Sequence, residues 1–353
     1  MTSRRVVPHT KTRTRSRVLV QRRTRRATTV SNEDSAVLPG AFGLGTFDIE
    51  GRVFTGAVID DRVHDVSALL GREVSVIGLL QDWDSAIDAL EELLSASAVG
   101  IPLDEVRPLP PVQPPGQLLC AGANYFRHVE QIVFAWFRND GDERSDDELR
   151  AFASQQARSR ASEPFMFPGI PSAVSGANDD VVLWTPGEKH DWELELGVLI
   201  AKPTHHVAPG DALSHVAGYT ISNDITVRDV MSRPGFPLTD FVTSKNRPTF
   251  FPTGPVIVPR RFIPDYRRLR ITLSVNGEVM QDQLIDDIIH GVEDCVSYAS
   301  QMTRLSPGDM ILTGSPAGNA GHHDNRWLRP GDVIESTITG LGMQRTLCVE
   351  PPA

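Results

Sequence analysis

The chain has 353 residues, which is long enough to bury a large hydrophobic core and to form two domains. A hydrophobic content of 40% and a charged content of 23% are those of an ordinary globular protein, and no apolar run approaches the ~20 residues of a membrane span. Three widely spaced cysteines form neither a disulfide framework nor a metal-ligand pattern, which favours a reducing cytoplasmic location.

The formal net charge of −10 is unevenly distributed along the chain. Residues 1–27 contain ten Lys or Arg and no acid, so the remainder carries 25 basic and 45 acidic residues, a charge of −20. An acidic body is a poor candidate for nucleic-acid binding. The basic arm could contact nucleic acid or an anionic surface, or act as a transit peptide, but residues 1–40 are best interpreted as a disordered extension without a catalytic role.

Residues 41–100 have the pattern of a small α+β domain. Two short strands are expected at 42–47 and 52–59, joined at Glu50-Gly51, and an amphipathic helix at 84–95. Six prolines between residues 101 and 117 predict an extended linker, which places the second domain at 118–353.

The second domain contains acidic side chains on an otherwise apolar strand. From Trp192 to Ile200 apolar residues alternate with Glu193 and Glu195, so the two carboxylates project from one face. The following strand, 218–223, leads directly into Asp224. Alternatively, Glu193 and Glu195 form the solvated face of an edge strand and Asp224 caps a turn. Three carboxylates without a thiolate form a hard oxygen site, suited to Mg²⁺, Mn²⁺ or Ca²⁺.

These residues fall within a pattern of motifs. Asp191 to Glu195 reads D-x-E-x-E, and Gly218 to Asp229 reads G-Y-T-x-x-N-D-x-x-x-R-D. Upstream, Gly122 to His128 reads G-x-N-Y-x-x-H, and Thr313 to Gly318 is close to T-G-T-P-x-G. In order and spacing the chain resembles the fumarylacetoacetate hydrolase (FAH) family. The resemblance implies an α+β fold, mainly β, in which mixed sheets roll around a divalent metal in a generally dimeric protein.

The resemblance also implies roles for individual residues. Glu193, Glu195 and Asp224 would bind the metal, with Arg228 and Asp229 supporting the site. His128 would activate water, since an imidazole titrates near neutrality and can accept a proton from a nearby water. Adjacent histidines at 205–206 and 322–323 are interpreted as solvated rather than metal-binding.

The sequence departs from the family around His128. The acid that relatives carry three residues after this histidine is replaced by Gln131, which could orient the imidazole but not stabilise its charged form. Glu130 is the nearest acid and is a candidate catalytic partner. Residues 125–163 are expected to form a lid that carries His128 and the aromatic stripe 134–137, and Glu143 or Glu148 could supply a carboxylate on closure.

Further residues are assigned by position in the motifs. Lys245 aligns with an active-site lysine that can balance the charge of an enolate or bind a carboxylate. Four residues are expected to contact substrate: Asn124, Tyr125, Gly314 and Ser315. Gly169 stands where relatives have a lysine, which implies a substrate with different charge or size at one end.

The resulting hypothesis is a metal-dependent hydrolase that cleaves a carbon–carbon bond in a β-dicarbonyl acid such as an acylpyruvate. Isomerisation or decarboxylation through an enolate on the same metal is the first alternative, and a non-catalytic metal-binding relative is the second. The expected partners are the small acid substrate and a second copy of the chain, with neither nucleic acid nor membrane.

Overall fold

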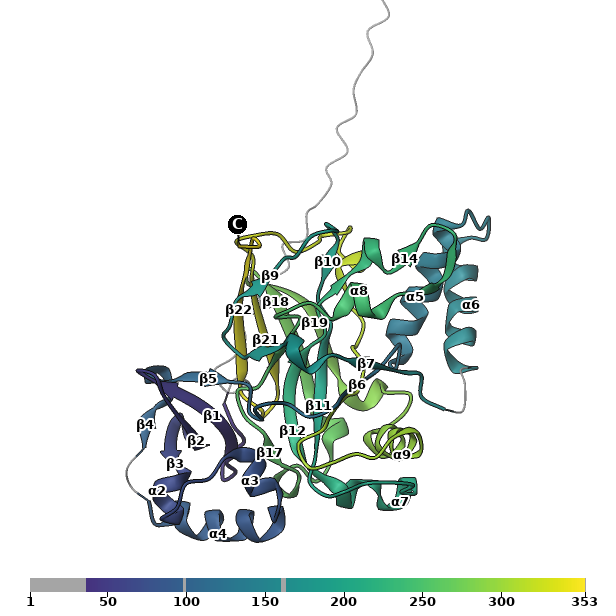
Figure 1. Cartoon of the computed structure of the whole chain (residues 1–353). Helices are drawn as coiled ribbons and strands as arrows, with labels where there is room; N and C mark the ends of the chain where they lie inside the picture. The colour runs from purple at the N-terminus through teal and green to yellow at the C-terminus, as the bar shows by residue number, and fades with distance from the viewer. Residues whose placement is uncertain (1–35, 98–99, 160–162, 353) are drawn as a thin grey trace, which may run out of the picture.

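The computed structural model describes residues 36–97, 100–159 and 163–352. The basic arm therefore lies outside the described residues. Three larger sheets and a set of helices make up the molecule, which confirms the predicted α+β class (Figure 1). None of the helices in these ranges has the length and apolar character needed to cross a membrane.

The N-terminal unit is a five-stranded sheet covered by three helices (Figure 1). Its strands, in the order β4-β3-β2-β1-β5, and its helices are β1 (Gly43–Ile49), β2 (Arg52–Ile59), β3 (Arg62–Asp65), β4 (Ile101–Pro102), β5 (Arg107–Leu109), α2 (Val66–Leu70), α3 (Val76–Leu80) and α4 (Trp83–Ser95). The β1–β2 turn lies at Glu50-Gly51, as predicted. Part of the range predicted as a linker instead forms edge strands, because β4 pairs with β3 and β5 with β1.

The central sheet is the largest and is built around β11 (Leu194–Ile200). Its other members are β6 (Leu118–Ala121), β7 (Met166–Gly169), β8 (Val174–Gly176), β12 (Val216–Asn223), β16 (Phe251–Thr253), β17 (Val258–Pro259) and β20 (Met310–Leu312). β12 and β20 flank β11 on its two sides, both antiparallel to it. All seven residues of β11 are buried, so it is an interior strand and the edge-strand alternative is excluded.

A second five-stranded sheet packs against the central one (Figure 1). It contains β9 (Val181–Val182), β18 (Arg270–Val275), β19 (Glu278–Leu284), β21 (Val333–Ile338) and β22 (Met343–Val349). The β18–β19 hairpin turns at Asn276-Gly277, where both residues have positive φ, as the sequence predicts. A core lies between the two sheets. It includes Leu194, Leu196 and Val198 from one face of β11, and Trp192, which precedes this strand.

The remaining elements surround these sheets. They are α5 (Phe126–Asn139), α6 (Asp146–Arg158), α7 (Pro209–Ala212), α8 (Phe241–Lys245), α9 (Val292–Met302), β10 (His190–Asp191), β13 (Thr226–Val227), β14 (Ser232–Arg233) and β15 (Phe236–Thr239). α5 and α6 form a helical hairpin beside α8 and β14 (Figure 1). The opposite face of β11 is apolar at one end and acidic at the other. Leu199, near the end of the strand, packs into a second core with the N-terminal helices, whereas Glu193 and Glu195 lie at its start.

The N-terminal unit is joined to the central sheet by a buried tryptophan. Trp83 at the start of α4 is 6% exposed, and its Nε1 donates a 3.0 Å hydrogen bond to the carbonyl oxygen of Ala217 in β12. Because the two residues are 134 positions apart, this bond fixes the N-terminal helices on the sheet that carries the acids.

Replacing this side chain tests the junction. Trp83→Phe removes the donor and leaves a buried carbonyl unsatisfied, so we expect the free energy of unfolding to fall by about 2 kcal/mol. Trp136→Phe is the matched control, because Trp136 is 69% exposed and its replacement should change stability by less than ~0.5 kcal/mol. Urea denaturation measures both, and equal effects would contradict the proposed coupling.

Candidate metal centre and active site

The acidic site is created by the register between β11 and β12. Leu194 pairs with Asn223 and Glu195 with Ser222, and the backbone N–H of Asp224 donates to the carbonyl oxygen of Glu193 at 2.8 Å. The pairing thus places Asp224 directly beside Glu193. One oxygen from each of Glu193, Glu195 and Asp224 lies within 4.8 Å of the others, and all three residues are buried.

The expected strand from residue 192 onwards is interrupted at its start. Trp192 and Glu193 lie between β10 and β11, outside the regular ladder. Side chains occupy the local backbone donors, because the N–H of Glu193 bonds to Asn223 Oδ1 at 2.9 Å and that of Leu194 to Gln281 Oε1 at 3.1 Å. The two glutamates nevertheless share one cavity.

Two cations approach the acids from neighbouring elements. Lys245, at the end of α8, places its Nζ 2.6 Å from Asp224 Oδ2 and 2.5 Å from Glu193 Oε2. Arg228 donates from Nη2 to Glu193 Oε1 at 2.6 Å and from Nε to Asp191 Oδ2 at 2.8 Å. Glu193 is therefore held between two cations, whereas the described contacts of Glu195 include no cation.

The pKa shifts follow this unequal distribution. Burial raises the pKa of Glu193, but Lys245 and Arg228 outweigh it and hold the pKa well below its usual range. Burial raises the pKa of Glu195 well above its usual range, and the charges of Asp224 and Glu193 raise it further. Burial also raises the pKa of Asp224, to about 6, although Lys245 opposes the shift. Negative charge at Glu195 is thus poorly compensated by the protein alone, and Asp224 shares its one bonded cation, Lys245, with Glu193 among the described residues.

This arrangement fits a hard divalent cation. Asp224 Oδ1 is buried and has no hydrogen-bond partner among the residues that the structure describes. Within the described ranges, the donor to Glu195 is the backbone N–H of Gly314, at 2.7 Å from Oε2. Oxygen donors that are buried, close together and short of positive charge are the ligands that Mg²⁺, Mn²⁺ and Ca²⁺ prefer. The triad can therefore bind a metal.

His128 projects into the same site from the first turns of α5. Its Nε2 lies 4.0 Å from Glu193 Oε1, and its side chain is 7% exposed. Burial lowers the pKa of His128 to about 4, so the imidazole is neutral at pH 7. Its Nδ1 is buried and has no hydrogen-bond partner within the described part of the chain.

The residues expected to assist His128 lie elsewhere. Gln131 does not orient the imidazole, because its Oε1 accepts a hydrogen bond from the backbone N–H of Gly318 at 3.2 Å. Glu130 does not line the cavity. It lies two positions after His128 in α5, and two positions on a helix rotate a side chain by about 200°. Glu148 is occupied in the capping box at the start of α6, and Glu143 is likewise absent from the cavity lining.

Three of the four residues predicted to contact substrate lie outside the cavity lining. Asn124 donates to the carbonyl oxygens of His290 and Thr313 and accepts from the N–H of His290, all at 2.9 Å. Tyr125 is fully buried, and the backbone N–H of Gly314 is bonded to Glu195. Contact of Asn124, Tyr125 and Gly314 with substrate stays a prediction. Ser315 does line the cavity, with its Oγ held by Gln281 Nε2 at 2.8 Å.

The acids open into a cavity of about 180 Å³ with two unlike walls. The polar wall contains His128, Glu193, Glu195, Asp224, Arg228, Lys245 and Ser315. The apolar wall contains Ala121, Gly122, Ala123, Ile132, Phe165, Phe167, Met231 and Phe241. The stripe at 134–137 takes no part, because Phe137 packs edge-on against Phe152 of α6 and Phe134 lies under Arg138 and Arg150.

Several residues of the site were not predicted from the sequence. Phe165 and Phe167 are two apart at β7 and could have been placed on one face by their spacing. Phe241 and Lys245 share a face of α8 because they are four apart. Gln281 gave no signal, since a glutamine within a strand is ordinarily solvent-exposed.

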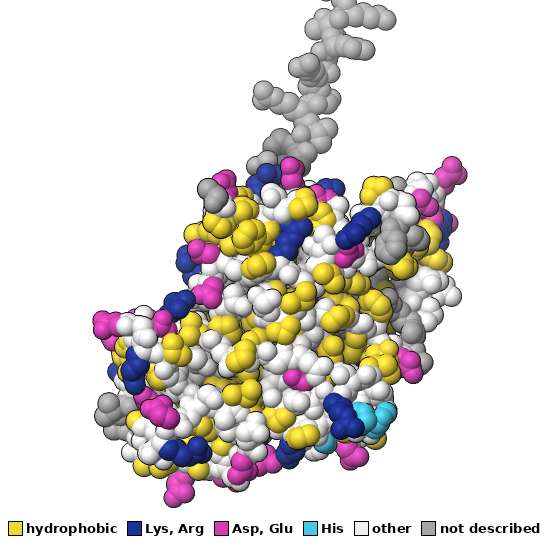
Figure 2. All heavy atoms as spheres, in the orientation of Figure 1, with side chains coloured by type: hydrophobic (Ala, Val, Ile, Leu, Met, Phe, Trp, Pro, Cys, Tyr) yellow, Lys and Arg dark blue, Asp and Glu magenta, His cyan; other side chains and the backbone are white. Residues whose placement is uncertain are grey.

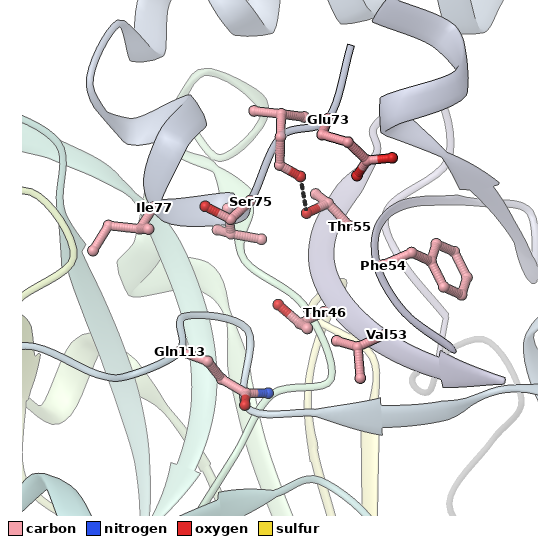
Figure 3. A pocket seen from close by; sticks show the side chains of 10 residues that line it. Thr46, Val53, Phe54, Thr55, Glu73, Ser75, Ile77 and Gln113 are labelled. Carbon is pink, nitrogen blue, oxygen red and sulfur yellow. Dashed lines mark hydrogen bonds between the residues drawn. The ribbon is translucent and has the colours of Figure 1, made fainter. Parts of the chain in front are cut away.

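A larger hollow of about 410 Å³ lies on the N-terminal unit, away from these acids (Figure 3). Thr46, Thr55 and Gln113 point towards it, but each hydroxyl or amide donates to a backbone carbonyl oxygen, of Pro111, Val74 and Pro110 respectively. Its one lining charge is Glu73. This hollow has no constellation of groups comparable to the acidic site.

An α+β scaffold that brings three buried carboxylates and an imidazole to one small cavity defines a class of protein suited to hold a divalent cation. Comparison with known proteins gives the family. Residues 117–349, more than half of the chain, match the family described as "Fumarylacetoacetate (FAA) hydrolase C-terminal". The chain belongs to the fumarylacetoacetate hydrolase family, as its motifs predicted.

Individual relatives differ in the reaction they are named for. Human mitochondrial oxaloacetate tautomerase FAHD2A is 31% identical over 266 residues, which are 75% of this chain and 76% of the relative. A probable 2-hydroxyhepta-2,4-diene-1,7-dioate isomerase from Mycobacterium abscessus superimposes with a TM-score of 0.68 at 28% identity, covering 88% of this chain and 100% of that one.

One similar structure contains a metal. Maleylpyruvate hydrolase from Sphingobium sp. SYK-6, solved with manganese(II) and pyruvate, has a TM-score of 0.68 at 27% identity and covers 88% of this chain and 100% of that one. The family thus includes proteins named as hydrolases, isomerases and tautomerases. A metal-binding relative agrees with the donor set of the triad.

Removing one acid tests the metal centre. Glu195→Gln keeps the shape of the side chain but removes a charge, so the affinity for Mn²⁺ should fall at least tenfold. Glu335→Gln is the control, because Glu335 is a partly exposed acid that pairs with Arg345 on the C-terminal sheet. Isothermal titration calorimetry measures both affinities. Equal Mn²⁺ binding by the wild type and Glu195→Gln would exclude this residue as a ligand.

Proposed function

We propose that the protein is a divalent-metal-dependent enzyme that enolises a β-dicarbonyl acid by moving a proton within the substrate. The observation that carries the proposal is a buried His128 whose Nε2 lies 4.0 Å from Oε1 of Glu193 in the carboxylate triad. Mg²⁺ is the proposed ion, with Mn²⁺ and Ca²⁺ as substitutes for the same oxygen donors. The named relatives that are isomerases and tautomerases support this reaction type.

A divalent ion in the triad would supply Lewis-acid polarisation of the substrate oxygens, which acidifies the carbon between the two carbonyl groups. His128 takes the proton from this carbon at Nε2, so the C–H bond breaks and its electron pair moves into the carbonyl system. The same imidazole then returns the proton to a carbonyl oxygen. No water or redox partner is consumed.

The other polar residues would position the reactants. Lys245 and Arg228 balance the charge of Glu193 and keep its two oxygens in place. Ser315 presents its hydroxyl to the cavity while Gln281 fixes its orientation. Lys245 is therefore proposed to act through the triad, rather than by direct contact with a substrate carboxylate.

Hydrolysis of the carbon–carbon bond is the second candidate. It is supported by the similarity to maleylpyruvate hydrolase. In both reactions His128 holds the proton as an imidazolium, which a carboxylate paired with Nδ1 would stabilise. Gln131 is instead bonded to Gly318, and Nδ1 has no partner among the described residues, so this contact does not distinguish the two reactions. Proton transfer within the substrate is preferred because it is supported by the relatives named as a tautomerase and an isomerase. Decarboxylation and a non-catalytic role are the remaining alternatives.

Product analysis separates these reactions. With Mg²⁺ and a short acylpyruvate we expect the keto and enol forms to equilibrate rapidly, which is measured by ultraviolet absorbance. Release of pyruvate should be at least tenfold slower. Pyruvate and a second acid in equal amounts would instead establish hydrolysis, and carbon dioxide would establish decarboxylation. A chelator should abolish turnover, and metal-independent conversion would contradict the proposal.

Removing the imidazole tests the proposed base. His128→Ala should lower kcat at least 100-fold, the usual contribution of a general base, while Mn²⁺ affinity changes less than about twofold. The affinity serves as the internal control, because His128 touches the triad but is not proposed as a ligand. Tautomerisation at the wild-type rate in His128→Ala would overturn its assignment.

A further inference from the structure

The apolar wall of the cavity carries an inference about the substrate, which rests on the proposed function. Phe167 and Phe241 are stacked with ring centroids 4.2 Å apart and planes inclined by 9°. Phe165 extends the cluster, at 5.9 Å from Phe241 and 6.4 Å from Phe167. Three aromatic rings from two separate segments thus form one continuous apolar surface in the lining of the cavity that contains the triad.

This surface remains accessible at the mouth of the cavity. Phe165 is 53% exposed and Ile132, from α5, is 43% exposed, whereas Phe167 is buried. A single exposed apolar residue is common on protein surfaces, but several around a cavity that contains polar chemistry indicate a binding site for apolar groups. The cluster therefore provides space for the part of a substrate that extends away from the acids.

The cations that line the cavity are already bonded to carboxylates of the protein, so they are not available to bind a second carboxylate of the substrate. Lys245 and Arg228 are the Lys and Arg side chains in the lining, all of which the structure describes, and both are bonded to carboxylates. A distal carboxylate would therefore meet aromatic faces, which carry negative partial charge. The cation beside them, Lys245 Nζ at 5.5 Å from the Phe167 ring centroid, is already bonded to Glu193 and Asp224.

We propose that the site selects β-dicarbonyl acids with one carboxylate and an uncharged, apolar acyl tail, and that Phe165, Phe167 and Phe241 determine this selectivity. The reacting dicarbonyl lies at the polar wall and the tail lies on the rings. Dicarboxylic acids of equal length are poor ligands. A cavity of about 180 Å³, equivalent to about six waters at ~30 Å³ each, accommodates a short tail beside the reacting group.

A series of acylpyruvates tests the selectivity. With Mg²⁺, kcat/KM should increase about threefold to fourfold for each methylene from acetyl- to pentanoylpyruvate, the factor expected for burial of a CH₂ group. A chain-length-matched acylpyruvate that ends in a carboxylate should react at least tenfold less efficiently than its uncharged counterpart. Equal or greater efficiency with the diacid, or no dependence on tail length, would overturn the inference.

A charge introduced into the wall provides the complementary test. Phe165→Lys should reduce the preference for the uncharged tail at least fivefold, whereas Phe165→Leu should retain it. Leu347→Lys is the matched control, because Leu347 is 40% exposed on β22 and does not line the cavity. An unchanged preference in Phe165→Lys, or an equal change in Leu347→Lys, would exclude this ring as a determinant.

Binding of non-reacting acids distinguishes this inference from the proposed function. With Mn²⁺ present, calorimetry should show tighter binding of 2-oxohexanoate than of 2-oxoglutarate, which is of similar size but has a terminal carboxylate. Preference for 2-oxohexanoate without turnover of any acylpyruvate would refute the proposed function and support the selectivity. Turnover with tighter binding of 2-oxoglutarate would refute the selectivity and leave the function intact.

Discussion

The antiparallel register of β11 and β12 is the constraint on which the site depends. Side chains alternate between the faces of a strand, so a slip of one residue would move both glutamates into the core that holds Leu194 and Leu196. The correct register puts Asp224 beside Glu193 and buries three carboxylates together. Such a cluster is costly unless cations compensate it, and the surrounding elements supply two of them.

Hydrogen bonds connect Arg228, one of the two cations, to the backbone around the site. Arg228 bridges Glu193 and Asp191, and Asp191 Oδ1 in turn accepts from the backbone N–H groups of Trp192 at 2.9 Å and Ala320 at 2.8 Å. This buried network connects the strand break at residues 192–193 to the loop that follows β20. Geometry at the triad is therefore fixed by contacts on all sides before a ligand binds, which reduces the reorganisation that binding requires.

The acidic triad could be predicted from the sequence because it follows from local periodicity and a motif. Alternation in residues 192–200 places Glu193 and Glu195 on one face, and the motif after β12 places Asp224 at its end, so the triad could be assigned without coordinates. The roles of Asn124 and Gln131 could not, because their partners His290, Thr313 and Gly318 are distant in sequence. A motif identifies the local arrangement of the chain, but hydrogen bonds to remote segments decide whether a polar side chain faces a cavity.

The two walls divide chemistry from specificity. Every positive side chain that lines the cavity is bonded to an acid of the network, so the electrostatic capacity of the site is directed at the reacting atoms. Recognition of the rest of the substrate falls to dispersion and the hydrophobic effect on three phenylalanines. Phe167 and Phe241 lie on β7 and α8 and Phe165 directly precedes β7, so the rings come from outside β11 and β12, whose register assembles the acids. The two parts of the site meet at α8, which also carries Lys245.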